Sequence, residues 1–150
     1  MSRFLFFTRK AVMCVAWQTP KTNWVSTDFI NYTDYERIRG NLGYLHDLAK
    51  TLYYGMPGLN AMTQKTSYSD YPYASEWNAL ETNLHRIFNN IITVRSIGSQ
   101  MTFYDNGTTP TYEELNRIES ATLNMYNTLT GQSSGRLTLS FVLNGGTIQV

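Results

Sequence analysis

The sequence feature that most constrains the fold is a six-residue pattern that occurs three times. Residues 34–39 read D-Y-E-R-I-R, residues 76–81 read E-W-N-A-L-E, and residues 114–119 read E-L-N-R-I-E. The copies lie roughly forty residues apart, a spacing typical of one supersecondary unit that is used several times. The chain is therefore expected to contain three related units.

When the three copies are aligned, the apolar positions downstream of them align as well. These positions recur at steps of three and four residues, as in an amphipathic helix that packs on other helices. They are Ile38, Leu42, Leu45, Ala49 and Leu52 in the first copy, Leu80, Leu84, Ile87, Ile91 and Val94 in the second, and Ile118, Thr122, Met125 and Leu129 in the third. The pattern predicts helices over residues 34–54, 75–96 and 111–130.

The residues around each copy also have the composition of a helix start. Thr33 with Glu36, and Thr111 with Glu114, match the capping box, in which a hydroxyl and a carboxylate satisfy free backbone amides. Ser75 is a weaker candidate cap for the second helix. We interpret the repeated letters as a cap, an acidic first turn and the first core residues. Gly40 and Gly43 lie inside the first helix, and we expect both to be positions of close packing.

The C-terminal residues have a different pattern. Leu137, Leu139, Phe141 and Leu143 alternate with mostly polar neighbours, and the Asn-Gly pair at 144–145 is typical of a hairpin turn. The predicted fold is therefore mainly α: an extended N-terminal arm (1–23), a three-helix bundle (24–132) and a small C-terminal β-hairpin (133–150). An isolated hairpin is marginal in water, so this one is expected to pack on the bundle or pair with another chain.

Composition argues against several classes of protein. Twelve Lys and Arg balance eleven Asp and Glu, which gives no strong field for nucleic acid or an acidic membrane surface. The single cysteine, Cys14, cannot form an intramolecular disulfide and is expected to be buried and inert. No run reaches the eighteen or so apolar residues of a membrane span. Arg9 and Lys10 interrupt the apolar N-terminal run, so we expect no signal peptide there and a soluble protein made in the cytoplasm, with Met13 an alternative start.

The sequence contains no recognisable catalytic motif. His46 and His85 are expected at the surface or its boundary, and no cofactor or metal site is predicted. The best candidates for acid–base chemistry are Glu76, Glu81, Glu114 and Glu119, but helix capping already accounts for their positions. Arg37 and Arg117 are expected to form helix-surface ion pairs with Asp34 and Glu114. We therefore predict that the protein is not an enzyme.

The aromatic content is high, with eleven Tyr, seven Phe and three Trp in a chain that is 15% charged. Tyrosine and tryptophan are enriched at protein interfaces, but a loop such as Y-S-D-Y-P-Y (68–73) could equally stack on a sugar. From the sequence we favour an interface, with sugar binding as the alternative. The candidate interface residues are Phe4, Phe6, Phe7, Trp17, Trp24, Tyr68, Tyr71, Tyr73, Leu139 and Phe141.

One longer stretch resembles a known kind of protein. Residues 20–38 read P-K-T-N-W-V-S-T-D-F-I-N-Y-T-D-Y-E-R-I. The pattern P-K-T-x-W, then D-x-[IF]-N, then D-[LY]-x-R-I resembles the start of a helical module in structural proteins of tailed bacteriophages and prophages of Gram-positive hosts. The matching positions are Pro20, Lys21, Thr22, Trp24, Asp28, Phe29, Asn31, Asp34, Tyr35, Arg37 and Ile38.

The resemblance implies a protein of the virion, made in the host cytoplasm and located in the tail-tip, baseplate or fibre-attachment region. It implies a non-enzymatic adaptor that joins other virion structural proteins as a symmetric homo-oligomer, without nucleic acid or membrane as partner. The alternative hypothesis is a carbohydrate-binding module that contacts a host cell-wall glycan through the tyrosine-rich loop.

Overall fold

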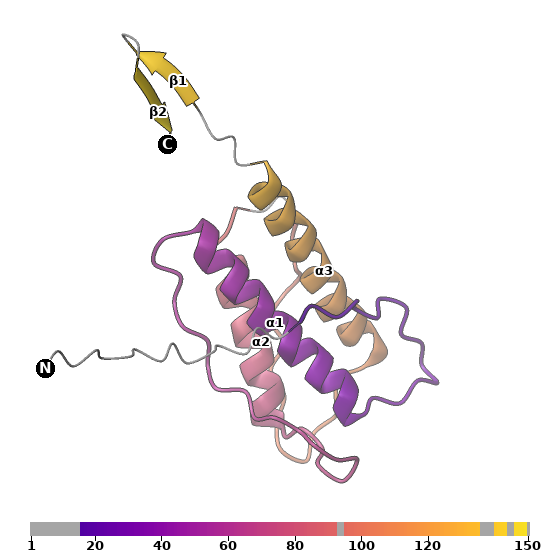
Figure 1. Ribbon diagram of the computed structural model, residues 1–150. Helices are drawn as coiled ribbons and strands as arrows, with labels where there is room; N and C mark the ends of the chain where they lie inside the picture. The colour runs from indigo at the N-terminus through magenta and orange to yellow at the C-terminus, as the bar shows by residue number, and fades with distance from the viewer. Residues whose placement is uncertain (1–15, 93–94, 136–139, 144–145, 150) are drawn as a thin grey trace, which may run out of the picture.

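The computed structural model describes residues 16–92, 95–135, 140–143 and 146–149. Most of them form a mainly helical domain with three helices, α1 (Tyr32–Leu52), α2 (Ala74–Phe88) and α3 (Tyr112–Ser134). The helices pack against one another around a shared apolar core (Figure 1). The predicted mainly helical fold with three helices is therefore confirmed.

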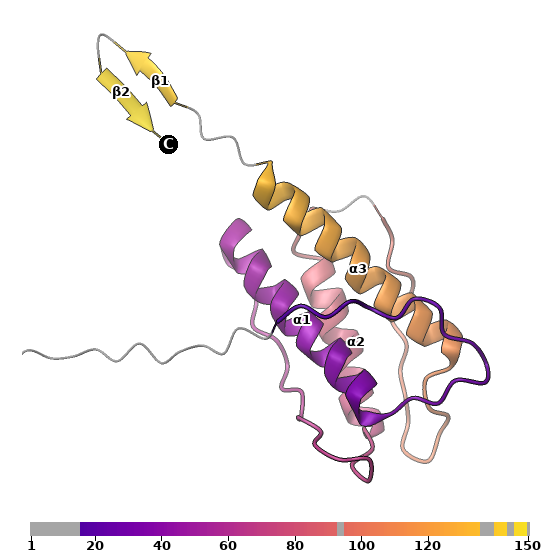
Figure 2. The same cartoon turned by 45° about the vertical axis from the view of Figure 1, so that its right-hand side comes forward.

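All three helices run in the same direction (Figures 1 and 2). Near the end where they begin, Tyr35 of α1 packs edge-to-face on Trp77 of α2, with ring centroids 5.7 Å apart. At the opposite end the Tyr53 hydroxyl, just after α1, donates to Gln132 Oε1 of α3 at 2.6 Å. Parallel helices cannot be joined by tight turns, because each connection must return along the bundle. This requirement explains why residues 53–73 and 89–111 are such long connections.

The predicted core positions are confirmed. Leu42, Leu45, Leu80, Leu84 and Leu129 are completely buried, and the other described members of the three series are buried or half-buried. Val94 lies outside the described residues.

The predicted end of the second helix at 96 is wrong, because α2 stops at Phe88. Asn90 donates from Nδ2 to the Arg86 carbonyl at 2.8 Å and so satisfies one of the free carbonyls at the helix end. Ile91 lies beyond the helix and is still buried, so the apolar spacing continues past the end of the helix.

The helix starts agree with the repeats, although two caps differ from the prediction. Thr111 caps α3 as predicted, and its backbone N–H donates to Glu114 Oε2 at 2.6 Å. The cap of α1 is Asn31, not Thr33, and that of α2 is Tyr73, not Ser75. The reason is that the first letter of each repeat is the third helical residue, whose carboxylate accepts a hydrogen bond from the cap backbone. These carboxylates belong to Asp34, Glu76 and Glu114.

The two glycines inside α1 differ from each other. Gly40 is buried, as expected of a close-packing position. A methyl group built at Gly43 would meet nothing within 4 Å. The expectation of close packing at Gly43 is therefore wrong.

Two short strands follow the bundle, β1 (Ser140–Leu143) and β2 (Gly146–Gln149). They pair antiparallel, with Phe141 opposite Ile148. Among the described residues neither strand packs on a helix. A C-terminal hairpin as part of the folded domain therefore has no support. None of the described helices is long and apolar enough to cross a membrane.

Candidate functional site

An extended segment precedes each helix and lies along the bundle. In the first segment, Gln18 is held by Asn41 of α1: its N–H donates to Asn41 Oδ1 at 2.9 Å, and its carbonyl accepts from Nδ2 at 2.7 Å. Asn116 of α3 holds Trp24 in the same way, at 2.8 and 2.9 Å. We call such a pair of hydrogen bonds an amide bracket. The first segment therefore lies in the groove between α1 and α3.

The second segment is held between α1 and α2. Asn83 of α2 forms an amide bracket with the backbone of Asn60, at 2.8 and 3.0 Å. The backbone N–H of Lys65, further along this segment, donates to Glu36 Oε1 of α1 at 2.7 Å.

The third segment lies between α2 and α3. Asn78 of α2 brackets the backbone of Phe103 at 2.8 and 2.9 Å. Arg117 of α3 donates to the Ile97 carbonyl at 3.3 Å. Each repeat therefore supplies, at its third letter, a side chain that binds an extended segment: Glu36, Asn78 or Asn116.

Two buried carboxylates tie the helices together. Glu119 of α3 is 1% exposed and accepts from Arg37 of α1, which also reaches Asp34 at 2.9 Å. Glu81 of α2 is completely buried and accepts from Arg117 of α3. The predicted ion pair of Arg37 with Asp34 is confirmed. The predicted ion pair of Arg117 with Glu114 is wrong, because Arg117 pairs with Glu81.

The capping role expected of these two carboxylates is also wrong. Glu81 and Glu119 are the last letter of their repeats, so they lie one turn inside the helix, where a carboxylate faces the neighbouring helix. Glu119 in addition accepts from the Lys21 backbone at 2.8 Å and from the Trp24 indole at 3.2 Å.

Burial shifts the protonation equilibria of the pair on α2. It raises the pKa of Glu81, although the Arg117 guanidinium opposes the shift. Burial also lowers the pKa of His85, helped by the charge of Arg117. The two side chains approach to 3.9 Å without a hydrogen bond, and neither lines a hollow described below. We therefore assign Glu81, His85 and Arg117 to the packing between α2 and α3 and not to a binding site.

His46, expected at the surface or its boundary, is 9% exposed, and its Nε2 lies 2.9 Å from the Pro57 carbonyl oxygen. In the described part of the chain, no three His, Cys, Asp or Glu side chains lie close enough together to hold a metal ion.

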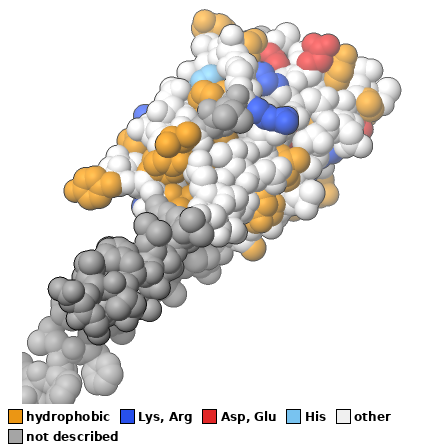
Figure 3. All heavy atoms as spheres, turned by 90° about the horizontal axis from the view of Figure 1, so that it is seen from above, with side chains coloured by type: hydrophobic (Ala, Val, Ile, Leu, Met, Phe, Trp, Pro, Cys, Tyr) orange, Lys and Arg blue, Asp and Glu red, His pale blue; other side chains and the backbone are white. Residues whose placement is uncertain are grey.

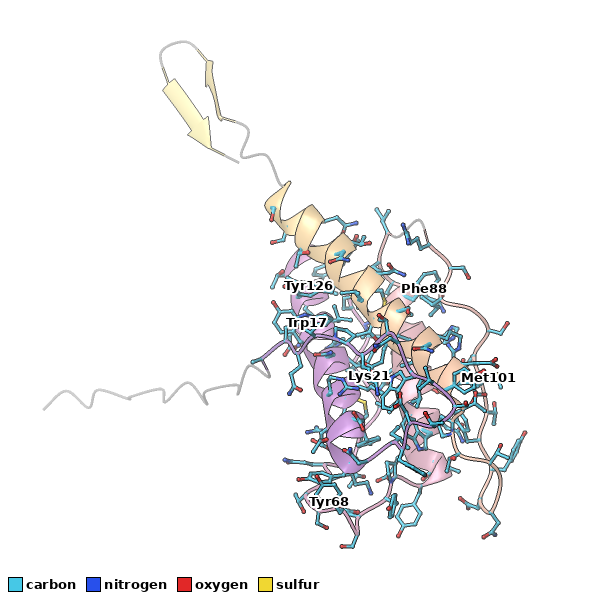
Figure 4. All side chains as sticks on the ribbon, turned by 90° about the vertical axis from the view of Figure 1, so that its right-hand side faces the viewer. Trp17, Lys21, Tyr68, Phe88, Met101 and Tyr126 are labelled. Atoms are coloured by element: carbon cyan, nitrogen blue, oxygen red, sulfur yellow. The ribbon has the colours of Figure 1, made fainter. Side chains whose placement is uncertain are left out.

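Exposed aromatic side chains gather where the three helices begin. They belong to the loops that lead into α1, α2 and α3, and Figure 4 shows Tyr68 at this end of the bundle. We call this surface the aromatic end face, and its residues are Val25, Phe29, Tyr68, Tyr71, Tyr73, Tyr104 and Tyr112. At the opposite end, seen in Figure 3, hydrophobic side chains form separate small groups. The aromatic end face is therefore the candidate functional site.

Two hollows lie on this face on either side of residues 104–111. The first has a volume of about 370 Å³ and is lined by Asp28, Phe29, Tyr71, Tyr112 and their neighbours. The second, of about 190 Å³, lies over Trp77 between Tyr73 and Tyr104. Both hollows are lined by Thr109, so they adjoin. The face can therefore receive two neighbouring apolar or planar groups.

The predicted interface residues fall into four groups, of which the last contains Trp24 alone. Tyr68, Tyr71 and Tyr73 are exposed on the aromatic end face. Trp17 is half-buried and stacks on Tyr126 at 4.0 Å between centroids (Figure 4). Phe4, Phe6, Phe7 and Leu139 lie outside the described residues, as does the side chain of Phe141 in β1.

Trp24 requires a correction, because it is only 3% exposed and packs within its own chain. Its ring lies under the Lys21 ammonium, 4.0 Å from the centroid, and its backbone is bracketed by Asn116. Sequence reasoning missed four residues of the face, Val25, Phe29, Tyr104 and Tyr112. The available signal was position, since each lies at or shortly before a helix start.

The chain matches no protein-family model, no curated protein and no solved structure at a significant level. The candidate site must therefore be interpreted from its own geometry and chemistry.

Proposed function

We propose that the protein is a non-enzymatic structural protein of a tailed-bacteriophage virion. In this proposal it is an adaptor, or a baseplate or tail component, that joins other virion proteins as a symmetric oligomer. The observation that carries the proposal is the gathering of exposed aromatic side chains on one end of the bundle. Phe29 is 92% exposed, and Tyr68, Tyr71 and Tyr73 are 70%, 67% and 69% exposed.

Such a surface is costly in water and favourable at an interface. Scattered apolar side chains are normal on a soluble protein, but a contiguous patch marks a binding surface. Tyrosine and phenylalanine bring large contact areas with few rotatable bonds, so ordering them on binding costs little entropy. The loops that carry them are anchored by capping carboxylates and amide brackets, which gives the face a defined shape before any partner arrives.

The resemblance to virion modules supports the assignment to a phage particle. In the matching stretch Lys21 pairs with Asp28 at 2.8 Å, Asn31 caps α1, and Tyr35 is in the core. These residues hold the first segment on the helix start. Phe29 is the large apolar residue of the stretch that serves no internal packing, which is consistent with a partner contact at that position.

The C-terminal hairpin belongs to the same proposal. The strands β1 and β2 leave their outer edges without a ladder partner in the described residues. A neighbouring subunit could add a strand there, with main-chain hydrogen bonds supplying affinity.

Mass spectrometry of purified particles, from a phage or induced prophage whose genome encodes this chain, tests the proposal. We expect the protein to copurify with the major tail proteins through a density gradient and to be labelled by antibody on particles in electron micrographs. A phage-encoded replication protein serves as the control for contamination. Absence of the chain from particles in which the tail proteins are abundant would overturn the proposal.

A glycan-binding function is the second candidate, and the first hollow favours it. Phe29, Tyr71 and Tyr112 present aromatic groups, while Asp28 and Thr109 present oxygen atoms. Aromatic faces stack on sugar rings, and carboxylate and hydroxyl groups bond their hydroxyls. Pull-down with purified host cell walls would test it: Tyr71→Ala should abolish binding, while Tyr54→Ala, an exposed tyrosine at the other end, should not.

A further inference from the structure

We propose that residues 1–15 of one copy of this chain dock on the aromatic end face of a second copy. The inference rests on the proposed function, because it names the contact through which the adaptor assembles with itself. Four observations carry it: the opposite charges of the segment and the face, the carboxylates that have no basic partner among the described residues, the two hollows, and the direction of the first segment.

Residues 1–15 and the end of the bundle that bears the aromatic end face have opposite net charges. Residues 1–15 contain Arg3, Arg9 and Lys10 and no acidic residue. At the end of the bundle that bears the aromatic end face, carboxylates outnumber basic side chains. The carboxylates are those of Asp28, Asp34, Glu36, Asp70, Glu76, Asp105, Glu113 and Glu114, and the bases are Lys21, Arg37, Arg39 and Lys65. Complementary charge steers association and selects the orientation of a partner.

The basic side chains at this end are already engaged, which leaves some carboxylates for a partner. Lys65 contacts both Asp70, at 3.1 Å, and Glu76, at 2.8 Å. Asp105 and Glu113 are exposed, and among the described residues neither has an ion pair with a basic side chain. Within the part of the chain that the structure describes, the Glu113 carboxylate accepts only from the Tyr112 hydroxyl, at 3.1 Å. Both acids lie beside the hollows, since Asp105 lines the second and Tyr112 the first.

The apolar residues of the segment fit the two adjoining hollows. Phe4, Leu5, Phe6 and Phe7 precede the basic pair Arg9 and Lys10. In an extended peptide, residues two apart lie on the same side, so Phe4 and Phe6 could enter neighbouring hollows while the basic residues reach the rim. Aromatic side chains seated in pockets with charges at the edge are the usual anatomy of an interface that binds well.

The direction of the first segment favours a second copy over the chain's own face. Residue 17 lies beside Tyr44 and Tyr126, well along the bundle, while Trp24 lies beside Asn116, close to the aromatic end face. The chain therefore approaches its own face from residue 17 to residue 24 (Figure 4). Residues 1–15 would have to reverse at residue 16 to reach that face, whereas the face of another copy needs no reversal. Such a contact is head-to-tail, and it generates a ring or a filament.

Charge reversal in the full-length chain tests the proposal. The arm variant carries Arg9→Glu and Lys10→Glu, and the face variant carries Asp105→Lys and Glu113→Lys. Sedimentation velocity should show that the wild type self-associates and that each variant alone associates at least about tenfold more weakly. Mixing the two variants should restore association, because the acidic segment of one then meets the basic face of the other and the reverse pairing is also complementary.

The control is Asp47→Lys, which reverses an exposed carboxylate in the second half of α1, away from the face. It should associate as the wild type does. A monomeric wild type, or a mixture that associates no better than its two components, would overturn the inference. If the protein is found in particles and mixing does not restore association, the contact between residues 1–15 and the aromatic end face is contradicted and the virion function is not. If mixing restores association but particles lack the protein, the contact is supported and the virion function is contradicted.

Discussion

The side-chain amide of Asn116 on α3 binds both backbone polar groups of Trp24, accepting from its N–H at 2.8 Å and donating to its carbonyl at 2.9 Å. An asparagine amide offers one donor and one acceptor side by side, so it replaces the neighbouring strand that an extended segment would otherwise need. The brackets at Asn41, Asn78 and Asn83 repeat this arrangement on the other helices. The extended segments are therefore integral parts of the bundle.

Asn116→Ala should destabilise the protein by about 2–3 kcal/mol. It removes two hydrogen bonds and leaves the peptide groups of a buried residue without their partner, which costs more than the net worth of the bonds. The measurement is urea unfolding followed by circular dichroism. Asn127→Ala on the exposed face of α3 is the matched control and should change stability by less than about 0.5 kcal/mol. Equal effects of the two substitutions would show that the bracket contributes nothing.

Arg37→Met should cost about 3 kcal/mol. The substitution keeps most of the apolar stem but leaves the buried Glu119 carboxylate without its cationic partner, and an uncompensated buried charge is costly. Arg39→Met, two residues along the same helix, breaks the more exposed pair with Glu36 and should cost about 1 kcal/mol or less.

Chemical denaturation of both variants provides the comparison. The result that would contradict this prediction is an Arg37 variant as stable as the Arg39 variant, since burial of the carboxylate would then carry no penalty.

The helices and their core positions could be predicted from the sequence, because the three-four spacing records which face of a helix is buried. Leu84 and Leu129 are examples, and both are completely buried. The end of α2 could not be found in the same way, because Ile91 continues the spacing after the helix has ended at Phe88. There a polar side chain, Asn90, competes for a helical carbonyl, and that competition leaves no trace in apolar periodicity.

The extended segments could not be predicted, because they have no periodicity of their own. The side chains that hold them were visible only as repeated letters, such as Asn78 and Asn116. The same limit produced the errors at Glu81 and Glu119: a carboxylate near a helix start suits capping, and only the packed structure shows it facing an arginine on the next helix. Of the candidate site, sequence reasoning found the tyrosines of the 68–73 loop and missed Phe29 and Tyr104.

Gly43→Ala should stabilise the protein by about 0.5–1 kcal/mol. The residue lies inside α1, an added methyl group meets no atom within 4 Å, and alanine loses less backbone entropy than glycine on folding. The matched control is Gly98→Ala, where φ is +77° and the methyl group would lie 2.8 Å from Arg117 Cδ. That substitution should destabilise the protein. Thermal unfolding of both variants checks the pair, and a destabilised Gly43 variant would restore the close-packing interpretation of that position.

Glu81→Gln should change the pH dependence of stability in a defined direction. Burial raises the pKa of Glu81 above its ordinary value of 4.5, so the folded state holds this proton more tightly than the unfolded state does. Between the ordinary value and the raised one, folding therefore takes up a proton, and stability falls as the pH rises. The contribution of Glu81 is largest below the ordinary value and is lost as the pH passes the raised value. Glutamine has no such proton.

The free energy of unfolding of the wild type minus that of Glu81→Gln should thus decrease as the pH rises from about 4 upward and then become constant. Urea unfolding at a series of pH values measures this difference, and most other titrating groups cancel because both proteins contain them. His85, 3.9 Å from Glu81, is the nearest neighbour that could couple to it. The comparison is therefore repeated in a His85→Gln background, where the same decrease is expected. A difference that stays constant in both backgrounds would mean that Arg117 offsets the burial penalty on the Glu81 carboxylate, and a difference that increases with pH would mean that Arg117 outweighs it.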